Sequence, residues 1–280
     1  MSLLYQTPPF DSSNRDSAMG FDLSILGFGA QGWGLQILVG TAVTVAVAIC
    51  SLLVGMLIGA VLVAMKLSRY RLVRLPAKLY TIFIRGTPEF LVILLVYFGS
   101  ESIINAILGS IGLGRIDLPK FPAAVAGLSA IYGAYVSEVL RGAYLAVPKG
   151  QMEAAAATGL SPFTSLVRIR IPQIWRYALP GLGNLWLSML KDSSLAAVIA
   201  LDELLRVSKL AGELTQHPLV FYSLAGLIYL GITALSDIGR RRLEAKAQLA
   251  YQTKAAPGKV EIKPKKTPKS DLRATGASHV

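Results

Sequence analysis

The chain has 280 residues, of which 53% are hydrophobic, and its mean hydropathy is +0.54. Only 16% of the residues are charged, well below the roughly 25% of soluble domains. This composition excludes an ordinary soluble domain and indicates a helical integral membrane protein. The formal net charge is +12, and residues 240–280 supply +8 of it, with eleven Lys or Arg against three acids. We interpret that basic segment as disordered chain near anionic lipid headgroups, not as a nucleic-acid-binding segment.

Five apolar stretches are long enough to cross a bilayer core of roughly 30 Å. They lie at residues 35–65, 80–108, 121–145, 178–200 and 219–238. The fold class expected is therefore all-α, a polytopic membrane protein with five transmembrane helices. The fourth stretch is interrupted by Lys191 and Asp192. We divide the chain into an extracytoplasmic or interfacial segment (1–30), a membrane domain (31–245) and a basic tail (246–280).

The distribution of Lys and Arg predicts the orientation of these spans. Segment 66–85 carries six, segment 141–176 carries five and the tail carries eleven. With five spans these three segments lie on one side and hold 22 of the 28 cations. Because short cytoplasmic loops retain cations, the N-terminus is expected outside and the C-terminus inside. The first 20 residues lack a basic region followed by an apolar core, so no cleaved signal peptide is expected.

Motifs for enzyme chemistry are missing from the sequence. There is no Gly-x-x-x-x-Gly-Lys-[Ser/Thr] phosphate loop, and Gly27, Gly29 and Gly32 spell Gly-x-Gly-x-x-Gly without a preceding strand or a βαβ unit. One cysteine and two histidines cannot supply a metal cluster of soft ligands, and no Gly-x-Ser-x-Gly elbow occurs. We therefore predict no catalytic residues, no metal and no cofactor bound by this chain; any ATP would have to be bound by a partner.

The loop between the third and fourth stretches resembles a compact helix-turn-helix. Residues 151–158 are Ala-rich and favour helix, and Gly159 suits a left-handed cap at the end of that helix. Ser161 is an expected N-cap with Pro162 at the first helical position, and Pro172 is expected to end the unit. Phe163, Leu166 and Val167 recur at helical spacing and give a short apolar stripe. The residues alone leave two alternatives open: a docking site for a partner, or an amphipathic loop lying on headgroups.

Ionisable residues inside the spans require a partner or a cavity, because each costs at least about 2.5 kcal/mol at the bilayer centre. Glu89 follows Arg85 by four residues and Glu138 precedes Arg141 by three, so two intrahelical pairs are one interpretation. The other is that Glu89 and Glu138, at similar depth, face one cavity and favour a cationic substrate. Lys191 and Asp192 form either a self-neutralised pair or a break in the helix at a transport site. Asp237 is expected to pair with the arginines at 240–242.

Gly55 and Gly59 form a Gly-x-x-x-Gly pair in the first span. Small residues at this spacing let two helices approach closely in lipid. Packing within the chain is the preferred interpretation, and a dimer face is the alternative.

The helix-turn-helix loop resembles the EAA signature of the permease subunits of bacterial ABC importers. The matching positions are Glu153, Ala154, Ala155, Gly159, Ile169 and Pro172, with Ile171 where Leu is usual. Further blocks resemble the polar amino-acid branch of these permeases, and within it the Q-type subunits for histidine, lysine/arginine/ornithine and opines. They are Arg85-Gly86-Thr87-Pro88, Ile131-Tyr132-Gly133-Ala134-Tyr135, Arg141-Gly142-Ala143, Val147-Pro148-Lys149-Gly150-Gln151 and Tyr177-Ala178-Leu179-Pro180-Gly181. The resemblance covers about residues 30–245.

The resemblance implies a type I ABC importer permease fold in the bacterial inner membrane and ATP-driven import of polar, and in particular basic, amino acids or opines. Its implied partners are an ABC ATPase dimer carrying ATP and Mg, a second homologous permease or a second copy, and an extracytoplasmic solute-binding protein. The implied ATPase-coupling residues are Glu153, Ala154, Ala155, Gly159, Phe163, Leu166, Ile169 and Pro172, with Glu153 beginning the first coupling helix. Glu89, Glu138, Arg141, Lys191 and Asp192 are the candidate residues of the substrate pathway. The alternative is a stand-alone secondary transporter or channel, which would show inverted repeats and need no docking loop.

Overall fold

The computed structural model describes residues 23–29 and 32–255, and this part of the chain contains helices and loops but no strand. The elements are η3 (Leu23–Leu26), α1 (Gly34–Lys66), α2 (Arg71–Gly86), α3 (Glu89–Ser110), α4 (Lys120–Ala146), α5 (Lys149–Ala157), α6 (Pro162–Ser165), η4 (Leu166–Arg170), α7 (Ile171–Asp192), η5 (Ser193–Ile199), α8 (Leu204–Thr215) and α9 (Pro218–Ala255). Here η3 and η5 are 3-10 segments and η4 is a π-helical segment. The all-α expectation is confirmed for these residues. The expected segments 1–30 and 246–280 fall largely outside them. The interpretation of the basic segment from residue 240 as disordered is wrong as far as Ala255, because α9 continues to that residue.

Within the described residues, four helices are long and apolar enough to cross a membrane: α1, α3, α4 and residues 218–247 of α9. They correspond to the first, second, third and fifth expected spans. The fourth expected span falls on α7 and η5, which are not among these four helices. The regular helix ends at Asp192 and continues as a 3-10 segment, so the polar interruption seen in the sequence is a real change of helix type.

The second expected span is not one continuous helix. Gly86 ends α2, Thr87 and Pro88 are extended, and Glu89 begins α3. Proline at position 88 disfavours helical backbone at the residue before it, which accounts for the break. Arg85 and Glu89 therefore lie on different helices, and the predicted i, i+4 pair between them is wrong.

The crossing of α1 and α4 forms the centre of the fold. A Cβ built on Gly55 would lie 3.4 Å from the Cβ of Tyr132, and one on Gly59 would lie 2.4 Å from a methyl carbon of Val136. Gly133 on α4 makes the reciprocal close contact with α1, because a Cβ there would lie 2.5 Å from a methyl carbon of Ile58. The two glycines of α1 thus pack within the chain, as preferred from the sequence, and bring the two backbones together.

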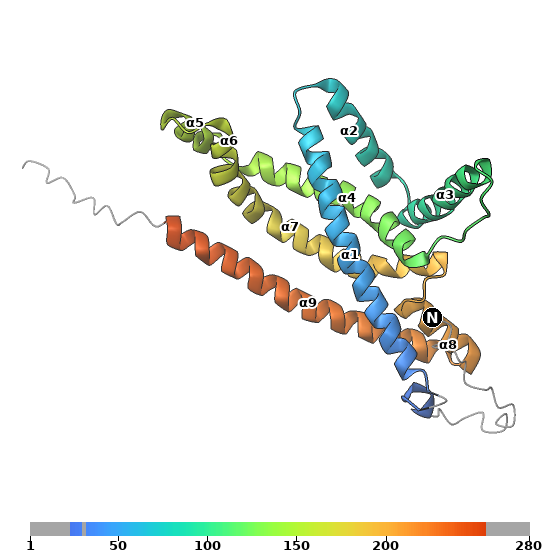
Figure 1. Ribbon diagram of the computed structural model, residues 1–280. Coiled ribbons are helices and arrows are strands. Elements are labelled where there is room, and N and C mark those ends of the chain that lie inside the picture. Colours follow the sequence, from blue (N-terminus) through green and yellow to red (C-terminus); the bar gives the residue numbers. More distant parts are fainter. Residues whose placement is uncertain (1–22, 30–31, 256–280) are drawn as a thin grey trace, which may run out of the picture.

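The helices form an elongated, open arrangement (Figure 1). α4 and α9 run toward the end that carries α5 and α6, α7 runs back from it, and α1 crosses them. α8 and the start of α1 lie at the opposite end. The fold therefore holds the helix-turn-helix unit at the joined ends of α4 and α7, away from α3 and α8.

The glycine-rich segment before α1 forms a compact turn. The backbone N–H of Gly34 donates to the carbonyl of Gly27, and that of Trp33 donates to Ile25. A Cβ on Gly32 would fall 2.0 Å from the Gly27 carbonyl oxygen, so the turn requires glycine there. The segment is an irregular entry into α1.

Candidate functional site

The turn of the helix-turn-helix unit is a glycine-capped helix end. Gly159 has a φ of +77°. Its N–H donates to the carbonyl of Ala156, and the N–H of Leu160 donates to that of Ala155. These two bonds are the pair that defines a Schellman motif, which satisfies the last carbonyls of α5. The predicted cap at Gly159 is confirmed.

The second half of the unit begins as the sequence indicated but ends differently. Ser161 caps α6 by accepting a hydrogen bond from the N–H of Thr164, and Pro162 follows at the first position. Pro172, however, lies in the first turn of α7 and does not close the unit. The π-helical segment η4, which contains Ile169, joins α6 directly to α7. A proline lacks an N–H, and the wider turn before it relieves the mismatch without stopping the helix.

The predicted apolar stripe of this unit is exposed. Phe163 is 75% exposed, Leu166 37% and Val167 43%. Glu153 and Ala154 are exposed as well, whereas Ala155 is buried. The prediction that Glu153 begins the first helix is wrong, because α5 begins at Lys149 and has no acid in its first turn. Docking of an ATPase on this surface stays a prediction.

An arginine anchors the unit to α4. Arg170 donates a hydrogen bond of 2.6 Å to the hydroxyl of Tyr144. Its guanidinium carbon also lies 3.8 Å from the centroid of that ring. A cation over an aromatic face is attracted by the ring quadrupole. These two contacts link η4 to the end of α4, and sequence spacing alone did not indicate them.

Glu138 is the centre of an ion-pair network that joins the end of α1 to α4. Arg141 binds one carboxylate oxygen at 2.9 Å, as its spacing predicted. Lys66, whose side chain is only 2% exposed, binds the other at 2.7 Å and also donates to Ser137. Both oxygens of Glu138 are therefore occupied by cations. The contact with Lys66 was missed because it joins the end of α1 to α4.

A second polar cluster gathers around the start of α3. Glu89 accepts a hydrogen bond of 2.8 Å from Tyr135, and Asp192 accepts one of 2.6 Å from Tyr132. Asp192 is close enough to act electrostatically on Glu89. The predicted pair of Lys191 with Asp192 does not occur in the part of the chain that the structure describes, and Lys191 is exposed. Here two carboxylates face two tyrosines, with no ion pair to Lys or Arg among the described residues.

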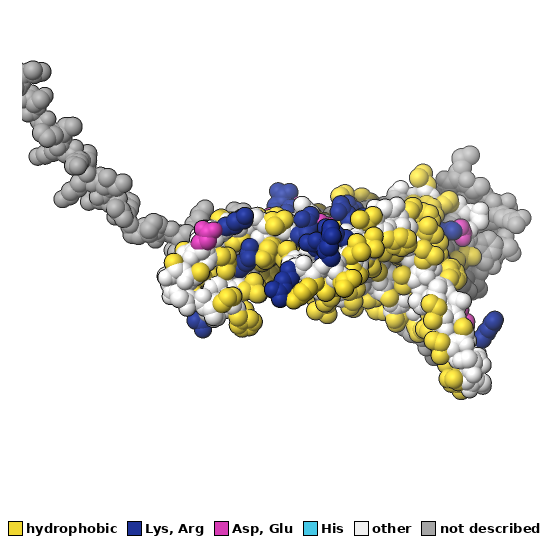
Figure 2. All heavy atoms as spheres, turned by 90° about the horizontal axis from the view of Figure 1, so that it is seen from above, with side chains coloured by type: hydrophobic (Ala, Val, Ile, Leu, Met, Phe, Trp, Pro, Cys, Tyr) yellow, Lys and Arg dark blue, Asp and Glu magenta, His cyan; other side chains and the backbone are white. Residues whose placement is uncertain are grey.

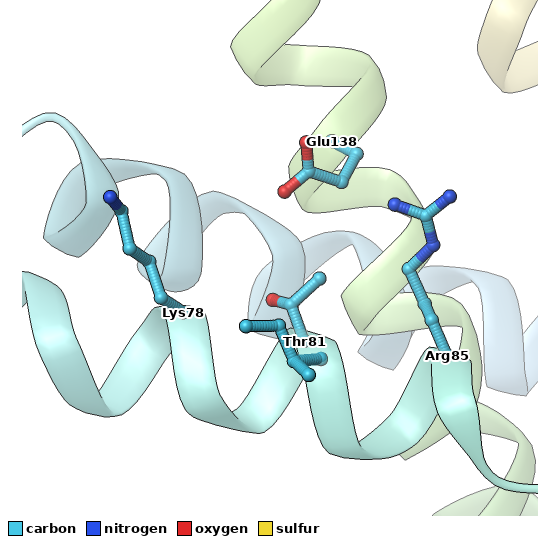
Figure 3. Close-up of a pocket in the computed structure, with 5 residues that line it drawn as sticks. Lys78, Thr81, Arg85 and Glu138 are labelled. Atoms are coloured by element: carbon cyan, nitrogen blue, oxygen red, sulfur yellow. The ribbon is translucent and has the colours of Figure 1, made fainter.

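Glu138 lines a groove between two helices. A groove of about 190 Å³ between α2 and α4 is lined by Glu138 together with Lys78, Thr81, Ile82 and Arg85. Figure 3 shows Lys78, Thr81 and Arg85 on α2 facing Glu138 on α4. Glu89 is not part of this lining, and a common cavity of Glu89 and Glu138 stays a prediction.

Glu203 is a buried polar residue that the sequence did not single out. Its side chain is fully buried and caps α8 by accepting hydrogen bonds from the N–H groups of Leu205 and Arg206. Thr44 on α1 and Tyr229 on α9 also donate to it, at 3.3 Å and 2.8 Å. Four donors meet one carboxylate, which fixes α8 against both helices. The local signal was an acid directly before an apolar helix.

Two remaining expectations concern ion pairs and metals. Asp237 binds Arg240 at 2.6 Å and Arg241 at 2.8 Å, which confirms the expected local network. Within residues 23–29 and 32–255 no group of three or more His, Cys, Asp or Glu side chains could hold a metal ion.

The fold, with its polar clusters inside the bundle and a helix-turn-helix unit at one end, is that of a membrane transport subunit. The chain belongs to the family of binding-protein-dependent transport system inner membrane components, whose model matches residues 51–248.

Characterised relatives agree with this assignment. The nopaline transport system permease protein NocQ of Agrobacterium fabrum is 42% identical over 80% of this chain and 95% of its own. The arginine ABC transporter permease protein ArtQ of Haemophilus influenzae is 40% identical over 72% of this chain and 88% of its own. The crystal structure of an amino acid ABC transporter with histidines matches with a TM-score of 0.67 and 29% identity, over 76% of this chain and 95% of that one.

Proposed function

We propose that this chain is the transmembrane permease subunit of an ATP-driven ABC importer for basic amino acids or opines. The observation that carries the proposal is the acidic cluster of Glu89 and Asp192 inside a permease fold, where neither carboxylate forms an ion pair with Lys or Arg among the described residues. Family membership supports the transport role. The names of the relatives, which include nopaline and arginine, support the substrate class.

In this proposal the cationic part of the substrate passes Glu89 and Asp192. Two carboxylates held by tyrosine hydroxyls stay available to an incoming cation, and in low dielectric the attraction is strong. Glu138 has a different role, because Lys66 and Arg141 already occupy both its oxygens. The substrate pathway is thus narrowed from five candidate residues to two, and Glu138 with Arg141 becomes part of the scaffold.

We further propose that the ATPase docks on the 151–172 unit. The exposed side chains of Phe163, Leu166 and Val167 offer a surface that a partner groove would bury. The Schellman turn and the Arg170–Tyr144 anchor make the unit stiff, so displacement by the ATPase would pass into α4 and α7. A partner shifts the spans only through different contacts in their two states. ATP and Mg belong to the ATPase, and this chain supplies no catalytic residue.

The proposed topology has five spans in the bacterial inner membrane. α7 is the fourth, and its polar residues are tolerated because they lie against other helices. The N-terminus is outside and the C-terminus inside, since the cation-rich segments begin within the last turns of α1 and α4 and in the C-terminal half of α9. The divisions 1–30, 31–245 and 246–280 belong to this proposal. A second permease, or a second copy, completes the pathway, and a solute-binding protein delivers substrate.

Reconstitution into proteoliposomes tests the proposal. The chain is combined with the ATPase, any sister permease and the binding protein encoded beside it, with ATP trapped on the ATPase side. We expect uptake of labelled arginine that requires ATP and exceeds uptake of labelled glutamate. Arginine uptake at equal rates without ATP would refute ATP-driven import. Equal uptake of glutamate would refute the acidic selection.

A further inference from the structure

α2 has three distinct faces. Ala77, Thr81 and Ile84 are buried against the bundle. Four cations, spaced by three, four and seven residues, share the next sector of the helix: Arg71, Arg74, Lys78 and Arg85. Leu75, Leu79 and Ile82 form an apolar face beside the cations and are 55%, 56% and 69% exposed. Water would solvate only the cationic face and hydrocarbon would cover only the apolar face. Such a helix is therefore suited to the boundary between the two.

The groove between α2 and α4 joins these two kinds of surface. Lys78 and Arg85 line it together with Ile82, and neither cation has a carboxylate partner among the described residues. Glu138 lies opposite, but Lys66 and Arg141 already hold its two oxygens. Four positive charges therefore lie in or beside the groove, on Lys78, Arg85, Lys66 and Arg141, against the one negative charge of Glu138. This excess of positive charge attracts an anion.

The position of the groove selects the kind of anion. α2 begins five residues after Lys66, the last residue of the apolar helix α1, and the next cations are Arg69, Arg71 and Arg74. Lys and Arg gather where a span leaves the hydrocarbon core on the cytoplasmic side. α2 therefore starts near the membrane boundary. Seen from the side of α2, Lys and Arg gather near the middle of the face with hydrophobic side chains around them (Figure 2). A free anion would leave the apolar side of the groove uncovered, whereas a phospholipid has a part for each surface.

We infer that the groove between α2 and α4 binds an anionic phospholipid, with its phosphate between Lys78 and Arg85 and an acyl chain along Leu79 and Ile82. The two cations are seven residues apart, about 10 Å along the helix axis, and their long side chains can close on one headgroup. Basic pockets between membrane helices are a general mode of recognition for such headgroups. The inference is independent of which solute is transported.

Lipid titration of the purified full-length chain, followed by native mass spectrometry, tests this site. The probes are dioleoyl phosphatidylglycerol and dioleoyl phosphatidylcholine, which differ in headgroup charge and share their acyl chains. We expect the phosphatidylglycerol preference to fall about 25-fold in Lys78→Gln/Arg85→Gln, because each cation near an anionic surface contributes roughly fivefold. Arg115→Gln/Lys120→Gln is the matched control: it removes two exposed cations from the α3–α4 end and should keep the preference.

Three additional measurements distinguish a lipid site from a misfolded variant and from a free-anion site. Lys78→Arg/Arg85→Lys keeps both charges and should retain binding, which distinguishes loss of charge from loss of fold. Ile82→Ser should weaken phosphatidylglycerol binding while the headgroup preference persists. Displacement of the lipid by an equal concentration of inorganic phosphate would overturn the proposal in favour of a free-anion site. Equal loss in the control pair, or no headgroup preference in the unaltered chain, would also overturn it.

Discussion

The turn at Gly159 allows a sharp test of the coupling unit, through Gly159→Val. Nothing lies within 4 Å of a Cβ built at Gly159, so the new Cβ has open space around it. Its φ of +77° is the obstacle, since a left-handed backbone costs an ordinary residue about 1–2 kcal/mol. That strain corresponds to roughly a 5- to 25-fold shift away from the native turn. Because the Schellman bonds of α5 depend on this turn, we expect coupling to the ATPase to fall within that range.

The assay is substrate-stimulated ATP hydrolysis in the reconstituted complex, with thermal unfolding as a check on the fold. Gly159→Asn should retain most coupling, because asparagine tolerates the left-handed region. Gly150→Val places the same side chain on α5 where no positive φ is needed and no atom lies within 4 Å, so it should be nearly neutral. If Gly159→Val and Gly159→Asn behaved alike, backbone strain would not be the cause. Full coupling in Gly159→Val would refute the role of this turn.

Three further predictions concern side chains within the bundle. Glu89→Gln should lower arginine uptake about 10- to 100-fold, the range expected when a hydrogen bond to a charged group is lost. Glu101→Gln on the same helix should leave uptake unchanged. Equal uptake by the two variants would contradict the proposed site. Glu138→Gln should lower the free energy of unfolding by about 3 kcal/mol, because it leaves the buried Lys66 without its carboxylate. Arg141→Gln should lower it by no more than about 1 kcal/mol. Thermal unfolding in detergent compares the two variants, and similar losses would argue against the buried pair. Gly59→Ala should destabilise by roughly 1–3 kcal/mol through overpacking, and Val136→Ala in the same chain should recover part of it; additive losses would mean that the two positions are not in contact.

The sequence by itself determined the helical membrane class, four of the spans and the position of the helix-turn-helix unit. It also determined the local features of that unit, namely the glycine cap at Gly159 and the N-cap at Ser161. Two local ion pairs, Glu138 with Arg141 and Asp237 with Arg240, followed from spacing alone. All of these depend on the helical period or on the backbone preference of a single residue. Both are determined by residues that are close together in the sequence.

Only the tertiary structure decided how the charged residues are shared between helices. Lys66 meets Glu138, Tyr135 meets Glu89 and Tyr132 meets Asp192 across helix crossings. The expected pairs of Arg85 with Glu89 and of Lys191 with Asp192 do not form among the described residues, and both acids accept hydrogen bonds from tyrosines instead. A residue's partner across a crossing depends on where two helix axes approach and at what rotation. In this chain glycines at the α1–α4 contact and the break at Pro88 set that geometry, and no local pattern encodes it.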